Sequence, residues 1–240
     1  MSASSVARRP RRVLVVGATG RLGVRIARAL RARDDRLILT ARDAAKLSAI
    51  SSELGGAAVA KTVCVDLTAR DAPESIAKQV REQGGIDDMI LACGPFPRTP
   101  FDGLRREDLE RTLAVHAVAP LLLVAALSSD LIASEGAVIA LGDAGVTRPY
   151  ENHVAYLTAK GALQTGLRAL AVELAPHVRI NMVALGIVAD PEADADPLRT
   201  HRLAARSPLG RFGTADEVAH VVLSLLDATW ATGEIWGIGR

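Results

Sequence analysis

The stretch VLVVGATGRLGVRIARAL, residues 13–30, carries the pattern that predicts the fold of this chain. It opens with Val13 to Val16, a short apolar run of mostly β-branched residues, typical of a parallel strand buried on both faces. The glycine-rich turn GATGRLG, residues 17–23, follows directly and leads into apolar residues at helical spacing. Gly17 permits a tight turn, and Gly23 lets the helix start pack closely on the strand. Strand, glycine turn and helix in this order predict a dinucleotide site, because free amide groups at the helix start can bind pyrophosphate.

Further strand and helix patterns alternate along the rest of the chain. Each short apolar run is followed by a turn and then by a helical pattern. This alternation predicts an α/β fold, a single Rossmann-type domain over residues 13–240 with a doubly wound parallel sheet of about seven strands. The expected strands are Val13–Val16, Leu37–Thr40, Val59–Val65, Met89–Ala92, Gly136–Leu141, Arg179–Ala184 and Glu234–Ile238, and the expected helices cover residues 24–33, 43–54, 72–83, 107–131, 151–175 and 214–226.

The composition argues against membrane and nucleic-acid partners. Of 240 residues, 49% are hydrophobic, which suffices for a substantial core, but no apolar run reaches the roughly 18 to 20 residues of a membrane span. The net charge is +2, and the four arginines within residues 8–12 supply +4, which leaves −2 for the remainder and no basic face for nucleic acid. Residues 1–12 lack the apolar core of a signal peptide, so we expect a flexible basic leader and a cytoplasmic location.

The cysteines and histidines do not predict a metal site or a disulfide framework. Cys64 and Cys93 are too few for such a framework, and no Cys/His cluster has the spacing of a zinc site. The expected partner is therefore a small-molecule substrate.

The end of the second expected strand determines the cofactor. An acidic residue there would bind the adenosine ribose hydroxyls and favour NAD, but Ala41 stands in that place with Arg42 beside it. A guanidinium can pair bidentately with the 2′-phosphate of NADPH, so we expect NADPH. Asp43, the expected N-cap of the next helix, brings a negative charge that weakens this preference. Asp66 and Leu67 follow the third strand, where a carboxylate could meet the adenine amino group.

Tyr156 and Lys160 are the candidate catalytic pair. They lie four residues apart in an expected helix, which places them on one face, one turn apart. A phenol ordinarily titrates near ~10, and an ammonium one turn away would favour the phenolate, lower this pKa and suit the group to acid–base catalysis. The same spacing also occurs between unrelated surface residues.

Two loops are candidates for substrate contact. The proline-broken loop CGPFPRTPF, residues 93–101, follows the fourth strand at the edge where open α/β sheets bind ligands. Only 3% of the residues are aromatic, so Phe96 in this loop is a candidate surface for stacking on a planar ring, with core packing as the alternative. Residues 187–207, acidic and then basic with Pro191 and Pro197 inside and Pro208 directly after, suit a mobile lid over a substrate.

The glycine turn, the downstream Tyr-x-x-x-Lys and the length together resemble the short-chain dehydrogenase/reductase family over residues 13–238. Within it, the chain is similar to the pteridine reductase and dihydromonapterin reductase group. Arg21 replaces the middle glycine of the turn, and Asp143 stands thirteen residues before the tyrosine, where most members carry serine. Phe96 falls where pteridine reductases stack the pterin, and His116 occupies the position of the asparagine in the long helix.

The resemblance implies an NADPH-dependent reduction of a C=N or C=O bond, with a dihydropterin as the preferred substrate, in a homo-oligomer. It implies that Tyr156, Lys160, Asp143 and His116 are catalytic and that Phe96, Asp143 and Tyr156 contact the substrate. The implied cofactor-binding residues are Gly17, Thr19, Arg21, Leu22, Gly23, Arg42, Asp66, Leu67, Gly94, Lys160, Gly186 and Val188.

The chain departs from the family pattern at three places. Leu91-Ala92-Cys93-Gly94 replaces Asn-Asn-Ala-Gly, Leu185-Gly186 replaces Pro-Gly, and the terminal Asp-Gly-Gly is reduced to Gly239-Arg240. The first two departures change residues of the expected cofactor loops. The third lies at the edge strand through which subunits of family tetramers often pair.

Alternatives remain open for the function and for two residues. The chain could be a carbonyl reductase of ketones or acyl-chain ketones, or a non-catalytic NADPH-binding sensor, although an intact Tyr156 and Lys160 argue against a sensor. The Asp143 carboxylate can only accept hydrogen bonds and would repel a developing alkoxide, which favours a heterocycle with N–H donors; its alternative role is a turn or helix cap. His116 could support a water-mediated proton route, brace the long helix or be a hydrogen-bonded core histidine.

Overall fold

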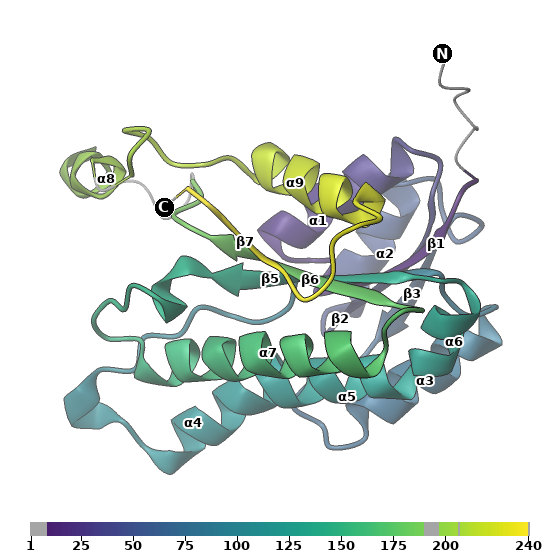
Figure 1. Ribbon diagram of the computed structural model, residues 1–240, viewed down its shortest axis with the longest axis horizontal. Coiled ribbons are helices and arrows are strands. Elements are labelled where there is room, and N and C mark those ends of the chain that lie inside the picture. The colour runs from purple at the N-terminus through teal and green to yellow at the C-terminus, as the bar shows by residue number, and fades with distance from the viewer. Residues whose placement is uncertain (1–8, 190–196, 206, 240) are drawn as a thin grey trace.

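The computed structural model describes residues 9–189, 197–205 and 207–239, and its centre is one parallel sheet (Figure 1). The strands lie in the order β3-β2-β1-β4-β5-β6-β7, so the expected doubly wound sheet is confirmed. Chain order reverses between β1 and β4, where the two halves of the sheet meet. The strands are β1 Arg12–Val16, β2 Arg36–Ala41, β3 Ala60–Cys64, β4 Asp88–Leu91, β5 Ala137–Asp143, β6 Arg179–Leu185 and β7 Ile235–Ile238.

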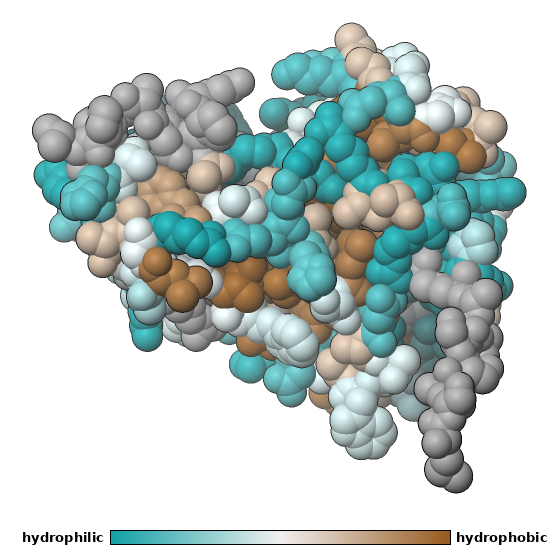
Figure 2. All heavy atoms as spheres, turned by 90° about the horizontal axis from the view of Figure 1, so that it is seen from above, coloured by the Kyte–Doolittle hydropathy of each residue, from teal (hydrophilic) through white to brown (hydrophobic). Residues whose placement is uncertain are grey.

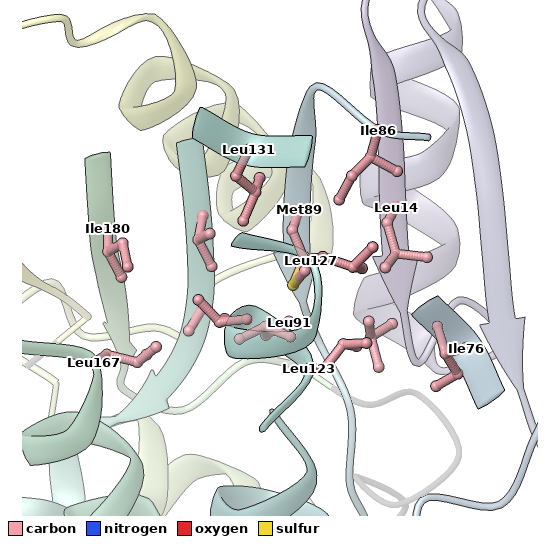
Figure 3. Close-up of a cluster of buried hydrophobic side chains, with 14 of the residues drawn as sticks. Leu14, Ile76, Ile86, Met89, Leu91, Leu123, Leu127, Leu131, Leu167 and Ile180 are labelled. Atoms are coloured by element: carbon pink, nitrogen blue, oxygen red, sulfur yellow. The ribbon is translucent and has the colours of Figure 1, made fainter. Parts of the chain in front are cut away.

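Helices cover both faces of the sheet because the central strands are apolar on both sides. One core lies under α1, α2 and α9, and the other lies under α3, α5, α6 and α7. Figure 3 shows the second core, where Leu14 and Met89 of the sheet meet Leu123 and Leu127. The helices are α1 Arg21–Arg31, α2 Ala44–Glu53, α3 Ala72–Glu82, α4 Arg106–Leu113, α5 Ala119–Ala126, α6 Ser128–Ala133, α7 Val154–Glu173, α8 Pro197–Ala204 and α9 Ala215–Asp227.

The outer surface of α1 and α9 is largely hydrophilic, with hydrophobic residues between the polar ones (Figure 2). Ion pairs link this surface: Arg25 of α1 contacts Asp216 of α9, and Arg33, in the turn after α1, lies 2.6 Å from Asp227 of α9. The predicted cap at Asp43 is also present, since its side chain accepts a hydrogen bond from the backbone N–H of Lys46 at the start of α2.

The expected continuous helix over residues 107–131 is wrong. A π-helical turn, Ala114–Val118, separates α4 from α5, and α6 begins after a break at Leu127. Pro120 has no N–H to donate to the carbonyl of His116 four residues earlier, so the helix widens at this point. Arg106–Ala126 is long and apolar enough to cross a membrane by composition alone, but in the fold it is bent by this turn and packs against α3 and α7, as a core helix does.

Two other boundaries differ from those expected. The helix that carries Tyr156 begins at Val154 rather than at residue 151, because Asn152 has a φ of +66° and interrupts the helical path. Strand β5 continues to Asp143, which is therefore the last residue of a strand. Part of the expected lid, residues 190–196 and 206, lies outside the described residues, while Pro197–Ala204 forms α8.

Buried carboxylates hold the amino edge of the sheet. Asp88 accepts two hydrogen bonds from the Arg11 guanidinium, at 2.6 and 2.9 Å, and one from the backbone N–H of Ala137 at 2.8 Å. Asp87 accepts from the backbone N–H of Arg12 at 2.8 Å. Burial raises the pKa of Asp88, and the nearby guanidinium opposes this shift. These pairings hold Arg11 and Arg12, the last two residues of the expected leader, against Asp88 and Asp87.

Replacing Arg11 with Met would leave the Asp88 carboxylate buried without its partner charge. We expect the Arg11→Met variant to lose about 3–5 kcal/mol in the free energy of unfolding, measured by urea denaturation. In an Asp88→Asn background residue 88 carries no charge, so Arg11→Met leaves no buried charge unpaired there. The loss in the free energy of unfolding should then be less than half as large. Equal losses in the two backgrounds would contradict this role for the pair.

Candidate active site

The glycine turn after β1 touches the end of β4. A Cβ atom on Gly17 would lie 2.7 Å from the carbonyl oxygen of Ala92 and from the Cα of Cys93, and the φ of Gly17 is +84°. A Cβ on Gly23 would overlap the carbonyl oxygen of Gly17, so the start of α1 also needs glycine here. Only glycine at both positions permits this approach of the two loops and α1.

A cavity of about 1130 Å³ opens at this carboxyl edge of the sheet. It lies at the reversal of strand order between β1 and β4, the place where doubly wound sheets bind dinucleotides. Several residues that the sequence predicted for the site line it, namely Gly17, Thr19, Arg42, Asp66, Leu67, Gly94 and His116.

The other predicted cofactor residues do not line this cavity. A guanidinium N–H of Arg21 donates to the carbonyl oxygen of Val188 at 3.3 Å, which connects the glycine turn to the segment after β6. A Cβ atom on Gly186 would overlap the Gly239 carbonyl, and the backbone N–H of Gly186 donates to the carbonyl of Ile238 at 2.8 Å, so Gly186 lies against the end of β7. The side chain of Leu22 packs against the core below α1.

Cationic side chains line the cavity beside the end of β2 and the start of α2. Arg42 and Lys46 both line it, on either side of Asp43. The Asp43 carboxylate caps α2 and lies 3.9 Å from the Lys46 ammonium, so its charge is partly neutralised. Asp66 accepts hydrogen bonds from the backbone and hydroxyl of Thr68, which lower the pKa of its carboxyl group. The residues present therefore fit a dinucleotide that carries a 2′-phosphate.

The Asp143 carboxylate is bound by both tyrosines of the chain. The hydroxyl groups of Tyr156 and Tyr150 donate to the same oxygen, Oδ2, at 3.1 and 3.0 Å. The second oxygen, Oδ1, accepts from the backbone N–H of Gly145 at 2.6 Å. Asp143 therefore has the alternative role that we expected, a turn cap, through Oδ1 only, while Oδ2 binds the two phenols.

The environment of Tyr156 opposes ionisation of its phenol. Burial raises the pKa of Tyr156, and the Asp143 carboxylate and the Tyr150 phenol raise it further. The pKa of the Tyr156 phenol is therefore raised on balance, and the Lys160 charge that we expected to lower it does not reverse this shift. The Lys160 ammonium donates to the carbonyl oxygen of Leu141 at 2.8 Å and lies 5.8 Å from the centre of the Tyr156 ring. Lys160 is itself buried, which lowers the pKa of its ammonium.

His116 lies beside Tyr156 but is a neutral ring. Its Nε2 contacts the carbonyl oxygen of Pro95 at 2.8 Å and must therefore carry the hydrogen. Burial and the Lys160 charge lower the pKa of His116 to about 3. Nδ1 is buried and has no hydrogen-bond partner among the described residues. These contacts match a hydrogen-bonded core histidine with one free acceptor.

The loop after β4 is fastened to the start of α7 and presents Phe96 beside Tyr156. The backbone N–H of Thr99 donates to the Asn152 carbonyl at 2.6 Å, and the His153 Nδ1 contacts the Pro97 carbonyl at 2.8 Å. Phe96 stacks on His153 at 4.1 Å between ring centres and meets Tyr156 edge-on at 4.8 Å. With 58% of its surface exposed, Phe96 is not a core residue, so the packing alternative is wrong.

The fold and the site together define a doubly wound α/β protein with a dinucleotide-sized cavity beside a Tyr–Lys pair. A family model described as enoyl-(acyl carrier protein) reductase matches residues 17–238. The chain belongs to the short-chain dehydrogenase/reductase family and is an oxidoreductase of that type.

Curated relatives include reductases of sugars and of acyl chains. The chain is 32% identical to L-xylulose reductase of Bos taurus, over 90% of this chain and 88% of the relative. It is 27% identical to 3-oxoacyl-[acyl-carrier-protein] reductase of Rattus norvegicus, over 92% of this chain and 93% of the relative. These names do not support the expected pteridine reductase subgroup.

Solved structures share the fold along nearly the whole chain. A short-chain dehydrogenase/reductase described as glucose/ribitol dehydrogenase, from Brucella melitensis, has a TM-score of 0.87 at 28% identity and covers 95% of this chain and 94% of its own. L-sorbose reductase from Gluconobacter frateurii, solved with NADPH and L-sorbose, has a TM-score of 0.87 at 20% identity and covers 95% of each chain, which shows the shared fold alone.

The sequence interpretation missed Tyr150 and Lys46. Tyr150 is one of only two tyrosines in a chain with few aromatic residues, and it follows Asp143 by seven positions in the expected loop. That rarity was an available signal. Lys46 lies at the start of the expected helix, four residues after Arg42, so a second cation stood close in sequence to the expected cofactor residue.

Removing the negative charge of Asp143 should make both tyrosines easier to ionise. Burial and the Asp143 carboxylate raise the pKa of Tyr150 and of Tyr156 in the folded protein. The contribution of the two protonated phenols to folding stability is therefore complete below the ordinary phenol pKa near 10, and it is lost as the pH rises through the raised values. We expect tyrosinate absorbance to appear at lower pH in Asp143→Asn than in the wild type. An Asp66→Asn control, which alters a carboxylate away from both phenols, should titrate like the wild type; no shift in Asp143→Asn would contradict the assignment.

Proposed function

We propose that the protein uses NADPH to reduce the ketone carbonyl of a small polyhydroxylated molecule. The observation that carries this proposal is the Tyr156 hydroxyl, which lies with Lys160 at the same sheet edge as the dinucleotide-sized cavity. The relatives named L-xylulose reductase and D-erythrulose reductase, at 32% and 30% identity, support a small ketose as substrate. The homologous 3-oxoacyl reductase supports carbonyl reduction more generally.

Each residue of the site has a proposed task. When bound, NADPH supplies the hydride for the carbonyl carbon. Tyr156 donates its hydroxyl proton to the carbonyl oxygen, and Lys160 provides positive charge near the phenolate that remains. Arg42 and Lys46 bind the 2′-phosphate at the far end of the cavity. The Gly17 turn and the start of α1 offer backbone N–H groups to the pyrophosphate.

Asp143 favours a substrate that carries its own hydrogen-bond donors. A simple ketone would bring only an acceptor oxygen, and the carboxylate would repel the alkoxide as it forms. A hydroxyl beside the carbonyl could donate to Asp143 and relieve that repulsion. A polyhydroxylated ketone therefore fits this site better than a plain one.

A dihydropterin is the second candidate, on the strength of Phe96 and Asp143. The Phe96 ring is exposed next to Tyr156 and offers a surface for a flat heterocycle. The amino and ring N–H groups of a pterin could donate to the Asp143 carboxylate. This candidate is kept because Phe96 contacts the Tyr156 ring and Asp143 accepts from the Tyr156 hydroxyl.

The first test is NADPH oxidation by the purified protein with small ketoses, plain ketones and dihydropterins, with NADH as the cofactor control. We expect turnover of ketoses that exceeds turnover of plain ketones, with NADPH preferred. Turnover confined to dihydropterins would favour the second candidate. Tight NADPH binding without turnover of any substrate would contradict both.

Replacing Arg42 with Ala should weaken NADPH selectively. Loss of a charge-assisted bidentate pair costs about 1.5–3 kcal/mol, so we expect the KM for NADPH to rise about 10- to 150-fold while the KM for NADH changes little. Arg36→Ala is the matched control, since Arg36 is exposed at the opposite end of the same strand. Equal effects on the two cofactors would exclude the 2′-phosphate as the partner of Arg42.

Replacing Tyr156 with Phe removes the proposed proton donor and keeps the ring. We expect kcat for ketose reduction to fall by about 10²- to 10⁴-fold, while NADPH binding, measured by calorimetry, stays near the wild-type value. Near-normal turnover with NADPH still bound would show that Tyr156 is not the acid.

A further inference from the structure

Tyr150 has no counterpart among the residues that the resemblance implied, yet it is hydrogen-bonded into the active site. Its hydroxyl reaches Asp143 Oδ2 at 3.0 Å, and the Tyr156 hydroxyl reaches the same oxygen at 3.1 Å. One carboxylate oxygen therefore bridges the two phenols. Because Gly145 holds the other oxygen, the bridging oxygen is fixed in direction.

Packing fixes the Tyr150 ring in this position. A Cβ atom on Gly145 would overlap the Tyr150 ring, so the absence of a side chain at residue 145 makes room for it. The ring meets His153 edge-on at 5.3 Å and lies 6.1 Å from Phe96. Such contacts on several sides hold the hydroxyl at Asp143.

The two phenols differ in their access to water. Tyr156 is buried, with 8% of its surface exposed, while Tyr150 is half-buried in the loop before α7. A proton that moves from Tyr150 to an ionised Tyr156 through the shared oxygen exchanges one phenolate for another. Because both groups are phenols, their intrinsic affinities for the proton are similar. The transfer moves the negative charge to the better solvated ring, Tyr150.

Two other polar groups near Tyr156 are already engaged. The His116 ring is neutral and its Nε2–H is bound to the Pro95 carbonyl, while the Lys160 ammonium is bound to the Leu141 carbonyl. Other ionisable groups that face this cluster are His153 at the start of α7 and Cys93 after β4. Among the described residues, Asp143 alone bonds directly to the Tyr156 hydroxyl and continues to a second hydroxyl.

We propose that Tyr150 is a positioning residue that acts through Asp143 to restore the proton of Tyr156 after each reduction. Once Tyr156 has given its proton to the substrate oxygen, the Tyr150 proton passes to Asp143 Oδ2 and on to the Tyr156 oxygen. Water then returns a proton to Tyr150, so each turnover consumes one solvent proton, and no group is oxidised or reduced in this step. The role rests on the proposed carbonyl reduction.

Tyr150→Phe tests this route because it removes the hydroxyl and keeps the ring. In steady-state ketose reduction we expect kcat to fall about tenfold, KM to change less than about twofold, and the solvent deuterium isotope effect on kcat to increase. The first turnover starts from protonated Tyr156, so its rate should stay within about twofold of the wild type. Thr147→Val removes an exposed hydroxyl from the same loop and should leave all four quantities unchanged.

Two kinetic outcomes would overturn the route. An unchanged kcat and isotope effect in Tyr150→Phe would show that the hydroxyl is not needed. An equal fall in the first-turnover rate and kcat would show that Tyr150 only shapes Tyr156 and does not resupply its proton.

A spectroscopic test examines the hydrogen-bonded link between the two phenols without any substrate. The chain has only two tyrosines, so labelling the ring carbon that bears the hydroxyl with ¹³C gives two NMR signals. Tyr150→Phe should remove one signal and shift the other, because Tyr156 loses the donor that shares its acceptor. An unmoved Tyr156 signal would overturn the link even if ketose reduction is established, whereas a shift without turnover of any ketone would place the failure in the proposed function.

Discussion

The burial of β1, β4 and β5 on both faces is the constraint on which the rest of the structure depends. Strands that are apolar on both sides need a helix layer above and below, and parallel neighbours need crossovers that return the chain to the same end of the sheet. All carboxyl ends therefore meet at one edge. The glycine turn after β1 and the loop after β4 come into contact there, and the cavity and the Tyr–Lys pair lie at this same edge.

The charges at that edge are balanced within a small buried group. The Asp143 carboxylate and the Lys160 ammonium carry opposite charges near Tyr156, and each is satisfied by hydrogen bonds to other groups. Burial favours the uncharged form of Lys160 and of the phenol. A bound substrate that brings donors to Asp143 would change this balance, so substrate binding and phenol acidity are coupled through one carboxylate.

Local patterns predicted most of the fold, and long-range contacts account for what they did not predict. The glycine turn, the apolar runs and the cap at Asp43 depend on residues close in sequence, and these predictions are confirmed. The break near His116 arises from one missing N–H at Pro120, within a segment whose apolar composition favours a continuous helix. The pKa of Tyr156 and the place of Tyr150 depend on Asp143, which reaches both phenols only after β5 and α7 have packed together.

The contact between Gly94 and His116 links two positions that lie far apart in the sequence. The His116 ring fills the space that a side chain at residue 94 would need. Residue 94 must also remain glycine for a second reason, because its φ of +108° is a backbone conformation that side chains rarely adopt. A side chain smaller than histidine at residue 116 would therefore leave a void that residue 94 cannot fill, so the glycine at 94 sets the volume that residue 116 has to occupy.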